Sequence, residues 1–516
     1  MAKCAYRGER IREIEEKWIG ENVKDEEERR RKKEYLNIIL ENLEEKADCR
    51  LEAIPGREFC IFHDPDYWRG HRDEVREEFL KHLKEDEEKL FIGFHLPDVK
   101  LPEVVEKELH MELTKLHGTL EAERTTFGEA SFSGATFEGE AWFGGAMFLG
   151  RTSFNDSVFS RLANFKDSVL FPDLLEKCLN PDNYVSFRRV RFEESGKAVF
   201  DGCRMRRVSF IYTDIGRIIF RNVDWGEDFK IFDEKLFMIK IGKGKEFFLR
   251  ECKEKVGRIL DVLNGNKDEE IESEIELGEP EMYKVLTELK ELKEKKEMSE
   301  EDKKRLEKLE EKLKELKEGL RSRVEKSLND LREGEKRGKI FEGVEKDEDL
   351  TFDNVLTVYR GLRDNYDYHL KYEESGRFFV NEMRLRRIVG RGHGGEKPHG
   401  LGGIKMRLSD IVEKVVMWVY EVLALYGESY ARPILWAILL IFSSSLIRPF
   451  WLWMQNPNWR PELDFILEQV KTSTLVFFQL HWDTRTLTIV ERLLSIPILG
   501  TLALALRRKL ERRVRH

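Results

Sequence analysis

The sequence predicts a multidomain chain in which a coil of short five-residue sides is followed by charged helices and then by two apolar helices. A phenylalanine recurs every five or six residues within 125–171. Leucines recur at alternating spacings of three and four residues within 306–320, and two uncharged apolar runs occupy 433–447 and 493–506. A period of five matches neither the 3.6 of a helix nor the 2 of a strand, so the repeat decides this part of the fold.

The five-residue period places one large and one small residue in each unit. A small residue, such as Ala135 before Phe137, stands two positions before each phenylalanine. If each unit forms one side of a square coil, the same side chains turn inward, and large and small residues together fill a narrow interior. The alternative is a set of ordinary strands rich in phenylalanine. The predicted inward-facing core residues are Phe127, Phe132, Phe137, Phe143, Phe148, Phe154, Phe159, Phe165, Phe210 and Phe220.

This pattern resembles the pentapeptide-repeat family. The resemblance implies a right-handed quadrilateral β-helix whose central phenylalanines and small residues face inward. We expect it to span 90–240, after a helical linker at 71–89, with a bulging loop at 172–183 where the phase breaks. Its open ends need caps, because an uncovered coil exposes unpaired backbone and apolar side chains.

Charge is abundant but unevenly distributed. Charged residues make up 37% of the chain and the net charge is −9, which says little about partners. Some pentapeptide-repeat proteins are thought to mimic DNA, which needs an acidic rod. The second block of repeats, 185–225, is basic, so we expect no nucleic-acid partner. Its arginines either form a solvated outer face or attract anionic lipid head groups or another acidic protein partner. They are Arg188, Arg189, Arg191, Arg204, Arg206, Arg207, Arg217 and Arg221.

The first region, 1–70, contains a candidate zinc site. Six cysteines in this length do not make a disulfide framework, and no apolar signal core precedes them, so reduced cytoplasmic thiols are expected. A turn at Pro55-Gly56 would return the chain toward the last two candidate ligands, and four soft or borderline ligands suit tetrahedral Zn²⁺. The run FCIFHDP also resembles a module that precedes some pentapeptide-repeat proteins. The alternative is buried structural cysteines and a surface histidine. The candidate ligands are Cys4, Cys49, Cys60 and His63.

The region 241–350 is predicted to be a helical insert with a coiled-coil hairpin. Leu306 to Leu320 form one seam and Leu286 to Leu292 a shorter one, with Ser299 as the N-cap of the second helix. An antiparallel hairpin within one chain explains both seams, and the alternative is a coil between chains.

The region 351–390 resembles a helical hairpin that joins pentapeptide rods to membrane segments, and 391–406 is a glycine-rich linker. The hairpin contains carboxylates at Glu373, Glu374 and Glu382. With no matched base, nucleophile or phosphate loop, we expect them to serve packing and the protein not to be an enzyme.

The region 407–516 is predicted to be a membrane domain. Each apolar run, extended by flanking residues, is long enough to cross a bilayer, and tryptophans suit its interface. The tail carries six basic residues, which stay on the cytoplasmic side of a membrane. We therefore expect two spans with both termini in the cytoplasm, and a half-polar re-entrant helix between the spans. The alternative is two buried helices of a soluble domain.

The helix order in this region resembles a two-span pore-loop channel. Such relatives are expected to carry a Thr-x-Gly-x-Gly-like filter, but 481–486 contains no glycine, so selective K⁺ conduction is not expected. Two functions follow. One is a non-enzymatic membrane-anchored scaffold or sensor in contact with lipids. The other is an oligomeric channel, a tetramer if it assembles as pore-loop channels do, with a degenerate filter gated by the rod. The pore-like residues are His481, Trp482, Asp483 and Glu491.

Overall fold

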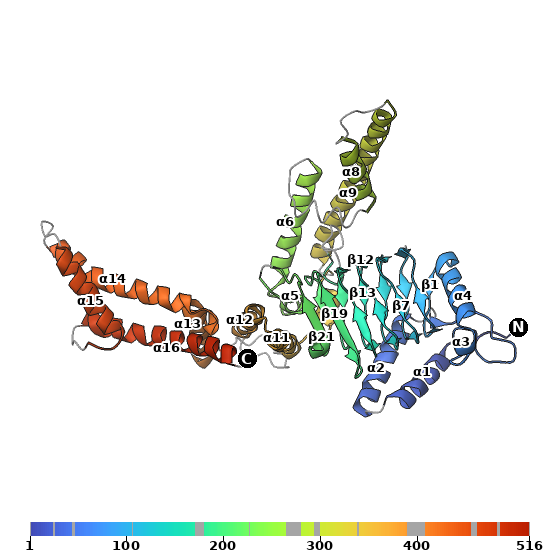
Figure 1. Cartoon of the computed structure of the whole chain (residues 1–516), viewed down its shortest axis with the longest axis horizontal. Coiled ribbons are helices and arrows are strands. Elements are labelled where there is room, and N and C mark those ends of the chain that lie inside the picture. Colours follow the sequence, from blue (N-terminus) through green and yellow to red (C-terminus); the bar gives the residue numbers. More distant parts are fainter. Residues whose placement is uncertain are drawn as a thin grey trace. The chain divides into compact units, whose positions relative to one another are not determined.

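The structure is a computed structural model that divides into two compact units, Met1–Asn365 and Tyr366–His516, each described by itself below (Figure 1). It describes residues 2–23, 26–43, 47–105, 107–170, 180–226, 228–264, 280–293, 300–337, 340–389, 408–455, 462–481 and 486–514.

The centre of the first unit is a parallel β-solenoid with four sheets, as the sequence predicts. Strands of about two residues alternate with turns, and each pairs in parallel with the corresponding strand of the next coil. The first sheet holds β1 (Lys89–Leu90), β5 (Leu109–His110), β9 (Ala130–Ser131), β13 (Thr152–Ser153), β17 (Val185–Ser186) and β20 (Val208–Ser209). The second holds β2 (His95–Leu96), β6 (Lys115–Leu116), β10 (Thr136–Phe137), β14 (Val158–Phe159) and β18 (Arg191–Phe192).

The remaining two sheets close the square. The third holds β3 (Val99–Lys100), β7 (Leu120–Glu121), β11 (Ala141–Trp142), β15 (Leu162–Asn164), β19 (Lys197–Asp201) and β21 (Ile218–Arg221). The fourth holds β4 (Val104–Val105), β8 (Thr126–Phe127), β12 (Met147–Phe148) and β16 (Val169–Leu170). A short 3₁₀ helix, η3 (Ile215–Arg217), precedes the last strand.

Phenylalanine stacks fill the interior of the solenoid. All ten predicted core phenylalanines are at most 2% exposed. Along one column, the ring of Phe154 stacks on Phe132 and Phe187 with centroid distances of 5.0 and 4.8 Å. Successive coils also approach closely outside the column, since a Cβ added to Gly139 would lie 2.1 Å from the carbonyl oxygen of Gly118. The alternative of ordinary strands is therefore wrong.

The described residues before the solenoid form four helices, the last of which packs on its first coil. They are α1 (Glu9–Asn22), α2 (Glu26–Leu43), α3 (Tyr67–Gly70) and α4 (Arg72–Glu85). Helix α4 buries Val75, Phe79 and Leu83, and the Phe79 ring packs edge-on against Phe91 of the first coil at 4.8 Å. This apolar face supplies the predicted cap at the N-terminal end.

At the other end, the strands stop before the boundary of the β-helix predicted at 240. The last strand ends at Arg221, and 232–240 forms the helix α5 (Phe232–Lys240). The carboxylate of Asp233 accepts hydrogen bonds from the Ser209 hydroxyl and from the Phe210 backbone N–H. Apolar residues at helical spacing and a carboxylate that binds backbone donors of the last coil favour a capping helix over another coil.

The insert after α5 consists of helices. They are α6 (Lys245–Leu263), α8 (Pro280–Lys293), α9 (Glu300–Arg337) and α10 (Glu342–Lys346), followed by α11 (Phe352–Tyr368). Helices α8 and α9 contact each other, as an intrachain hairpin requires, with Leu289, Leu292 and Leu320 buried. The N-cap predicted at Ser299 lies outside the described residues. That these helices form a coiled coil stays a prediction.

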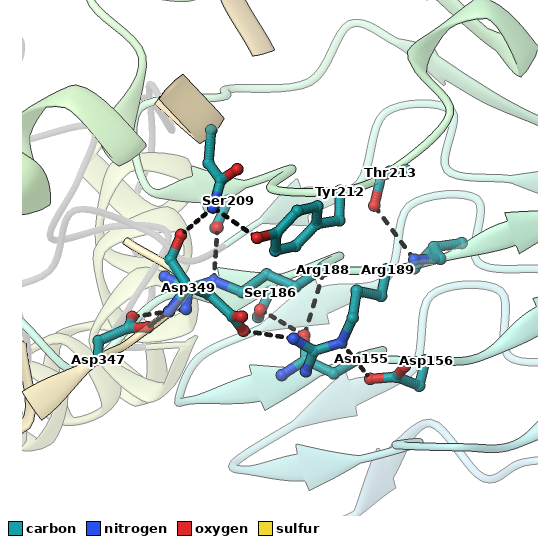
Figure 2. A network of polar contacts seen from close by, with 12 residues as sticks. Asn155, Asp156, Ser186, Arg188, Arg189, Ser209, Tyr212, Thr213, Asp347 and Asp349 are labelled. Carbon is teal, nitrogen blue, oxygen red and sulfur yellow. Dashed lines mark hydrogen bonds and ion pairs between the residues drawn. The ribbon is translucent and has the colours of Figure 1, made fainter. Parts of the chain in front are cut away.

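Two arginines of the solenoid bind the segment that returns from the insert. Arg188 donates to Asp347 at 2.5 Å and to the Ser209 hydroxyl at 2.9 Å, while Arg189 pairs with Asp156 at 2.8 Å and with Asp349 (Figure 2). Arg188 is only 5% exposed. Burial raises the pKa of Asp233, and the positive charge of Arg188 acts against that rise. These two arginines therefore hold the fold together and do not belong to an outer basic face.

The second unit contains only helices among its described residues. They are α12 (Tyr372–Val389), α13 (Leu408–Ala424), η5 (Leu425–Gly427), α14 (Ala431–Gln455), α15 (Leu463–Phe477) and α16 (Thr486–Val514). Arg384 and Arg387 of α12 pair with Glu421 of α13 at 2.7 and 2.9 Å. Helices α14, α15 and α16 contact one another. The predicted linker 391–406 lies outside the described residues.

We expect Phe137→Asp to unfold the solenoid, because an unpaired carboxylate inside the phenylalanine column costs several kcal/mol, roughly 4 or more. Lys166→Asp is the control, since it adds the same carboxylate at an exposed turn and is expected to cost under about 0.5 kcal/mol. Limited proteolysis and thermal unfolding of the full chain would measure both. Equal resistance of the two variants would show that the inward phase is wrong.

Arg188→Met should destabilise the first unit by about 3 kcal/mol, because it leaves the carboxylates of Asp347 and Asp233 without their buried cation. The matched control is Arg221→Met, an exposed arginine of the last strand, expected to change stability by less than about 0.5 kcal/mol. Thermal unfolding monitored on both variants would test this. A melting temperature of Arg188→Met equal to that of the control would contradict it.

Candidate metal centre

The four predicted ligands come together at one point. Their candidate donor atoms all lie within 4.8 Å of one another, and all four residues are buried. The Nδ1 atom of His63 lies 3.2 Å from the sulfur of Cys60 and 3.7 Å from that of Cys4, and the sulfurs of Cys49 and Cys60 are 3.8 Å apart. Three sulfurs and one ring nitrogen are a ligand set that zinc takes in structural sites.

Short backbone contacts bring the ligands together. The N–H of Cys4 donates to Leu51 at 3.1 Å, and the N–H of Cys49 donates to Tyr6 at 3.0 Å. Helices α1 and α2 therefore lie between two segments that meet again at the site, and this brings Cys4 to the other three ligands. The predicted turn is present, with Gly56 at φ +81°. The N–H of His63 then donates to the carbonyl of Cys60 at 3.2 Å, which holds both on one tight turn.

The His63 ring is oriented by groups outside the ligand set. Its Nε2 lies 2.9 Å from the carbonyl oxygen of Ile92 in the first coil. A carbonyl only accepts, so Nε2 carries a proton, and Nδ1 is the ring nitrogen that faces the sulfurs. The Tyr6 ring stacks on His63 at 4.0 Å, and the Tyr6 hydroxyl donates to Glu15, which pairs with Lys115 of β6. The candidate site thus fastens the N-terminal module to the solenoid.

The thiols of the cluster influence one another's protonation. Hydrogen bonds from Cys49 and Cys60 hold the pKa of the Cys4 thiol far below its usual range, against the opposing effect of burial. The pKa of Cys49 is raised because its thiol is the donor to Cys4. Burial lowers the pKa of His63, but the hydrogen bonds to Cys4 and Cys60 outweigh it and raise the pKa to about 9. The cluster therefore stabilises a thiolate, the form that binds a metal.

A cavity of about 680 Å³ borders the cluster at Cys49 and His63. Across it, the His82 ring lies 3.0 Å from Asp86. Four protein ligands already complete a tetrahedron, so the set fits a closed structural centre better than a catalytic one, which keeps a position open.

The pore-like residues lie in the second unit. His481 follows α15, and its carbonyl accepts a hydrogen bond from Arg492 at 3.4 Å. Glu491 of α16 is buried and accepts a hydrogen bond from the Ser473 hydroxyl of α15, while Ser444 of α14 is a further hydrogen-bond partner. Trp482 and Asp483 lie outside the described residues, as does most of the stretch 481–486.

The serine partners of Glu491 were missed by sequence reasoning. The signal that could have found them is the Ser443 to Ser445 run in an otherwise apolar segment. Because polar residues in such helices usually face a neighbouring helix, this run indicates a helix–helix contact. The structure accordingly uses Glu491 to join three helices, and Ser473 also donates to the carbonyl of Ile441 at 3.1 Å.

Comparison with known protein families identifies the repeat. The family model described as Pentapeptide repeats (9 copies) matches residues 112–158 and 122–169. No curated protein and no solved structure matches the chain. The matched residues hold the coils in which the phenylalanines stack and each strand pairs with the next coil. The repeat region of this chain is therefore a pentapeptide-repeat solenoid.

Proposed function

We propose that this protein is a non-enzymatic scaffold that holds a pentapeptide-repeat solenoid at a membrane. The observation that carries the proposal is the presence, in one chain, of this solenoid and of two long apolar helices with little protein cover. The helices are Ala431–Gln455 and Thr486–Glu511, and only 12% and 22% of their most apolar windows are buried. The core helix of a soluble protein buries its apolar side chains, so such exposed faces favour lipid as the surrounding medium.

Two of the three carboxylates that could pass for an enzyme motif form ion pairs within their own helix. Glu373 pairs with Arg377 at 2.8 Å, and Glu382 is 2% exposed and pairs with Arg386 on the same helix. Each is matched with an arginine four residues later, which is the spacing of a helix-stabilising pair. These contacts support the assignment of a scaffold rather than a catalyst.

The membrane arrangement is tested by extraction and labelling. We expect the protein to need detergent for extraction and both termini to lie in the cytoplasm, because six basic residues at the end of the chain are costly to carry across. A cysteine introduced as Asn458→Cys, in the predicted outer connection, should react with an impermeant maleimide added outside intact cells. His516→Cys is the control and should react only after permeabilisation. Labelling of His516→Cys from outside would contradict the topology.

A pore-loop type channel is the second candidate function. It is favoured by one observation: the half-polar helix α15 contacts both α14 and α16, as a short helix between an outer and an inner helix should. One such hairpin cannot enclose a pore, so a channel requires an oligomer, and we expect a tetramer with poor discrimination between K⁺ and Na⁺. Its conduction path would include His481 and Glu491.

Two measurements distinguish the channel function from the scaffold function. Current recordings in planar bilayers test conduction, and light scattering in mild detergent gives the oligomeric state. A monomer that passes no current rejects the channel and leaves the scaffold. An oligomer with currents that distinguish poorly between K⁺ and Na⁺ establishes the channel. Sharp K⁺ selectivity would show that the filter lies elsewhere than 481–486.

We further propose that the Cys4, Cys49, Cys60 and His63 cluster holds zinc. When bound, the ion would supply a structural crosslink between the N-terminal module and the turn before the solenoid, and its binding free energy would add to folding. The convergence of four buried donors and the orientation of His63 by Ile92 support this assignment.

Purified protein should contain about one zinc ion per chain by elemental analysis under reducing, chelator-free conditions. Cys60→Ser should lose the metal and lower the melting temperature of the first unit, since its sulfur is central to the set. Cys203→Ser, a buried cysteine of the solenoid outside the cluster, is the matched control and should keep its zinc. Metal-free protein from such a preparation would refute the assignment.

A further inference from the structure

Helix α13, which precedes the first long apolar helix, turns an apolar face outward. Within 412–424, the exposed side chains are four valines and one tryptophan, each between 36% and 58% exposed. They stand at positions i, i+3, i+4, i+6 and i+7, which lie on one side of an α-helix. They are Val412, Val415, Val416, Trp418 and Val419. The outward side of this helix therefore carries no charge within 412–424.

The polar side of the same helix faces protein. Glu421 pairs with Arg384 and Arg387 of α12 at 2.7 and 2.9 Å. The other two charged residues within 412–424 are partly covered, and they are Glu413 and Lys414. A surface helix of a soluble protein has the reverse arrangement, with its apolar face on the core and its charged residues in water. An apolar medium therefore suits the outward face of α13 better than water does.

The place of α13 in the chain keeps it beside both long apolar helices. It ends at Ala424, and α14 begins at Ala431. The ring N–H of Trp436 in α14 donates to the carbonyl oxygen of Val422 in α13 at 3.1 Å. Near the end of α16, Arg508 donates to a carbonyl of the turn η5, which follows α13, at 3.0 Å. The start of one proposed span and the end of the other thus both lie next to α13.

From its outward apolar face and its contacts with both proposed spans, we infer that α13 lies along the surface of the bilayer with this face in the lipid. The helix has 17 residues and three charged residues within 412–424, so it is too short and too polar to cross the membrane. A helix in the interface places its apolar face among the acyl chains and keeps its polar face outside them. Trp418 suits that depth, because tryptophan is enriched at membrane interfaces.

This inference rests on the proposed membrane anchoring by α14 and α16, and it adds a third contact with lipid. Because Glu421 holds two arginines of α12, a helix α13 that lies on the bilayer also fixes α12 near the membrane surface. The occupant of the apolar face is lipid rather than a soluble partner, since the spans on either side of α13 place this face at the bilayer.

Fluorescence quenching by nitroxide-labelled lipids tests where the outward face lies. Full-length protein with a nitrobenzoxadiazole label on the cysteine of Val416→Cys is reconstituted in phosphatidylcholine nanodiscs. Separate preparations contain lipids with the nitroxide near the head group or near the end of the acyl chain. The shallow nitroxide should quench the label about twofold more strongly than the deep one, because an interfacial helix stays near the head groups. Labelled protein without an introduced cysteine gives the background.

Two control positions make the test specific. Lys414→Cys lies on the other side of the same helix, so the shallow nitroxide should quench its label about twofold less than the label of Val416→Cys. Ser443→Cys replaces an exposed residue at the middle of α14 with one of similar size. Its label should be quenched most strongly by the deep nitroxide if α14 spans the bilayer.

The outcomes separate this inference from the membrane anchoring on which it rests. Quenching of Ser443→Cys without quenching of Val416→Cys, or equal quenching of Val416→Cys and Lys414→Cys, would overturn the inference and leave the anchor. Stronger quenching of Val416→Cys by the deep nitroxide would also overturn it. Absence of quenching at both Ser443→Cys and Val416→Cys would reject the anchor and the inference together. Excimer emission from pyrene attached to Val416→Cys would show that a second copy of the chain covers this face, and would overturn the assignment to lipid.

Discussion

The phenylalanine column inside the solenoid is the interaction on which the rest of the first unit depends. Each ring needs a partner in the coil below and another in the coil above, as Phe154 has in Phe132 and Phe187. The backbone strands that carry the rings pair in parallel from coil to coil, so the rings and the hydrogen bonds repeat with one spacing. A residue shifted from its place in the five-residue repeat would therefore disrupt the ring stacking and the backbone hydrogen bonds together.

The stack of coils has two ends, and each end is covered by a neighbouring helix. At the start, α4 covers the first coil, and the Cys/His cluster holds the N-terminal segment against it through the contact of His63 with Ile92. At the finish, α5 satisfies donors of the last coil through Asp233, and Asn365 of α11 donates to the carbonyls of Ile215 and Ile218. Polar groups of the last coil are thus satisfied by helices.

Buried charge in the first unit occurs where separate segments meet. Arg188 and Arg189 hold the segment after the insert, as Figure 2 shows, and Lys115 with Glu15 holds α1 to the second sheet. Each charge has a partner from a distant part of the sequence. Breaking one partner leaves a buried charge unpaired, so these pairs define one arrangement of the segments and penalise others. In the second unit, by contrast, the long helices leave apolar faces exposed and bury hydroxyls and Glu491 between them.

The sequence alone determined the features that repeat or that are local. A period of five with an alternating large and small residue can be satisfied only by a coil whose sides turn the same residue inward, and the runs of apolar residues at 433–447 and 493–506 determined the two long apolar helices. The four candidate metal ligands could be named because cysteine and histidine at such spacing have few other uses in reduced protein.

What the tertiary structure decided is which distant groups meet. Whether Cys4 joins Cys49 depends on α1 and α2 leaving and returning at one point, and no local pattern encodes that closure. The arginines of the second block look alike in sequence, yet Arg188 is buried against Asp347 while Arg207 lines a cavity. The strands also stop at Arg221, with one further bridge at Asp224, and the helix α5 follows, whose Asp233 accepts from the Phe210 N–H. These outcomes follow from long-range contacts, whose partners lie too far apart in the chain for periodicity or spacing to pair them.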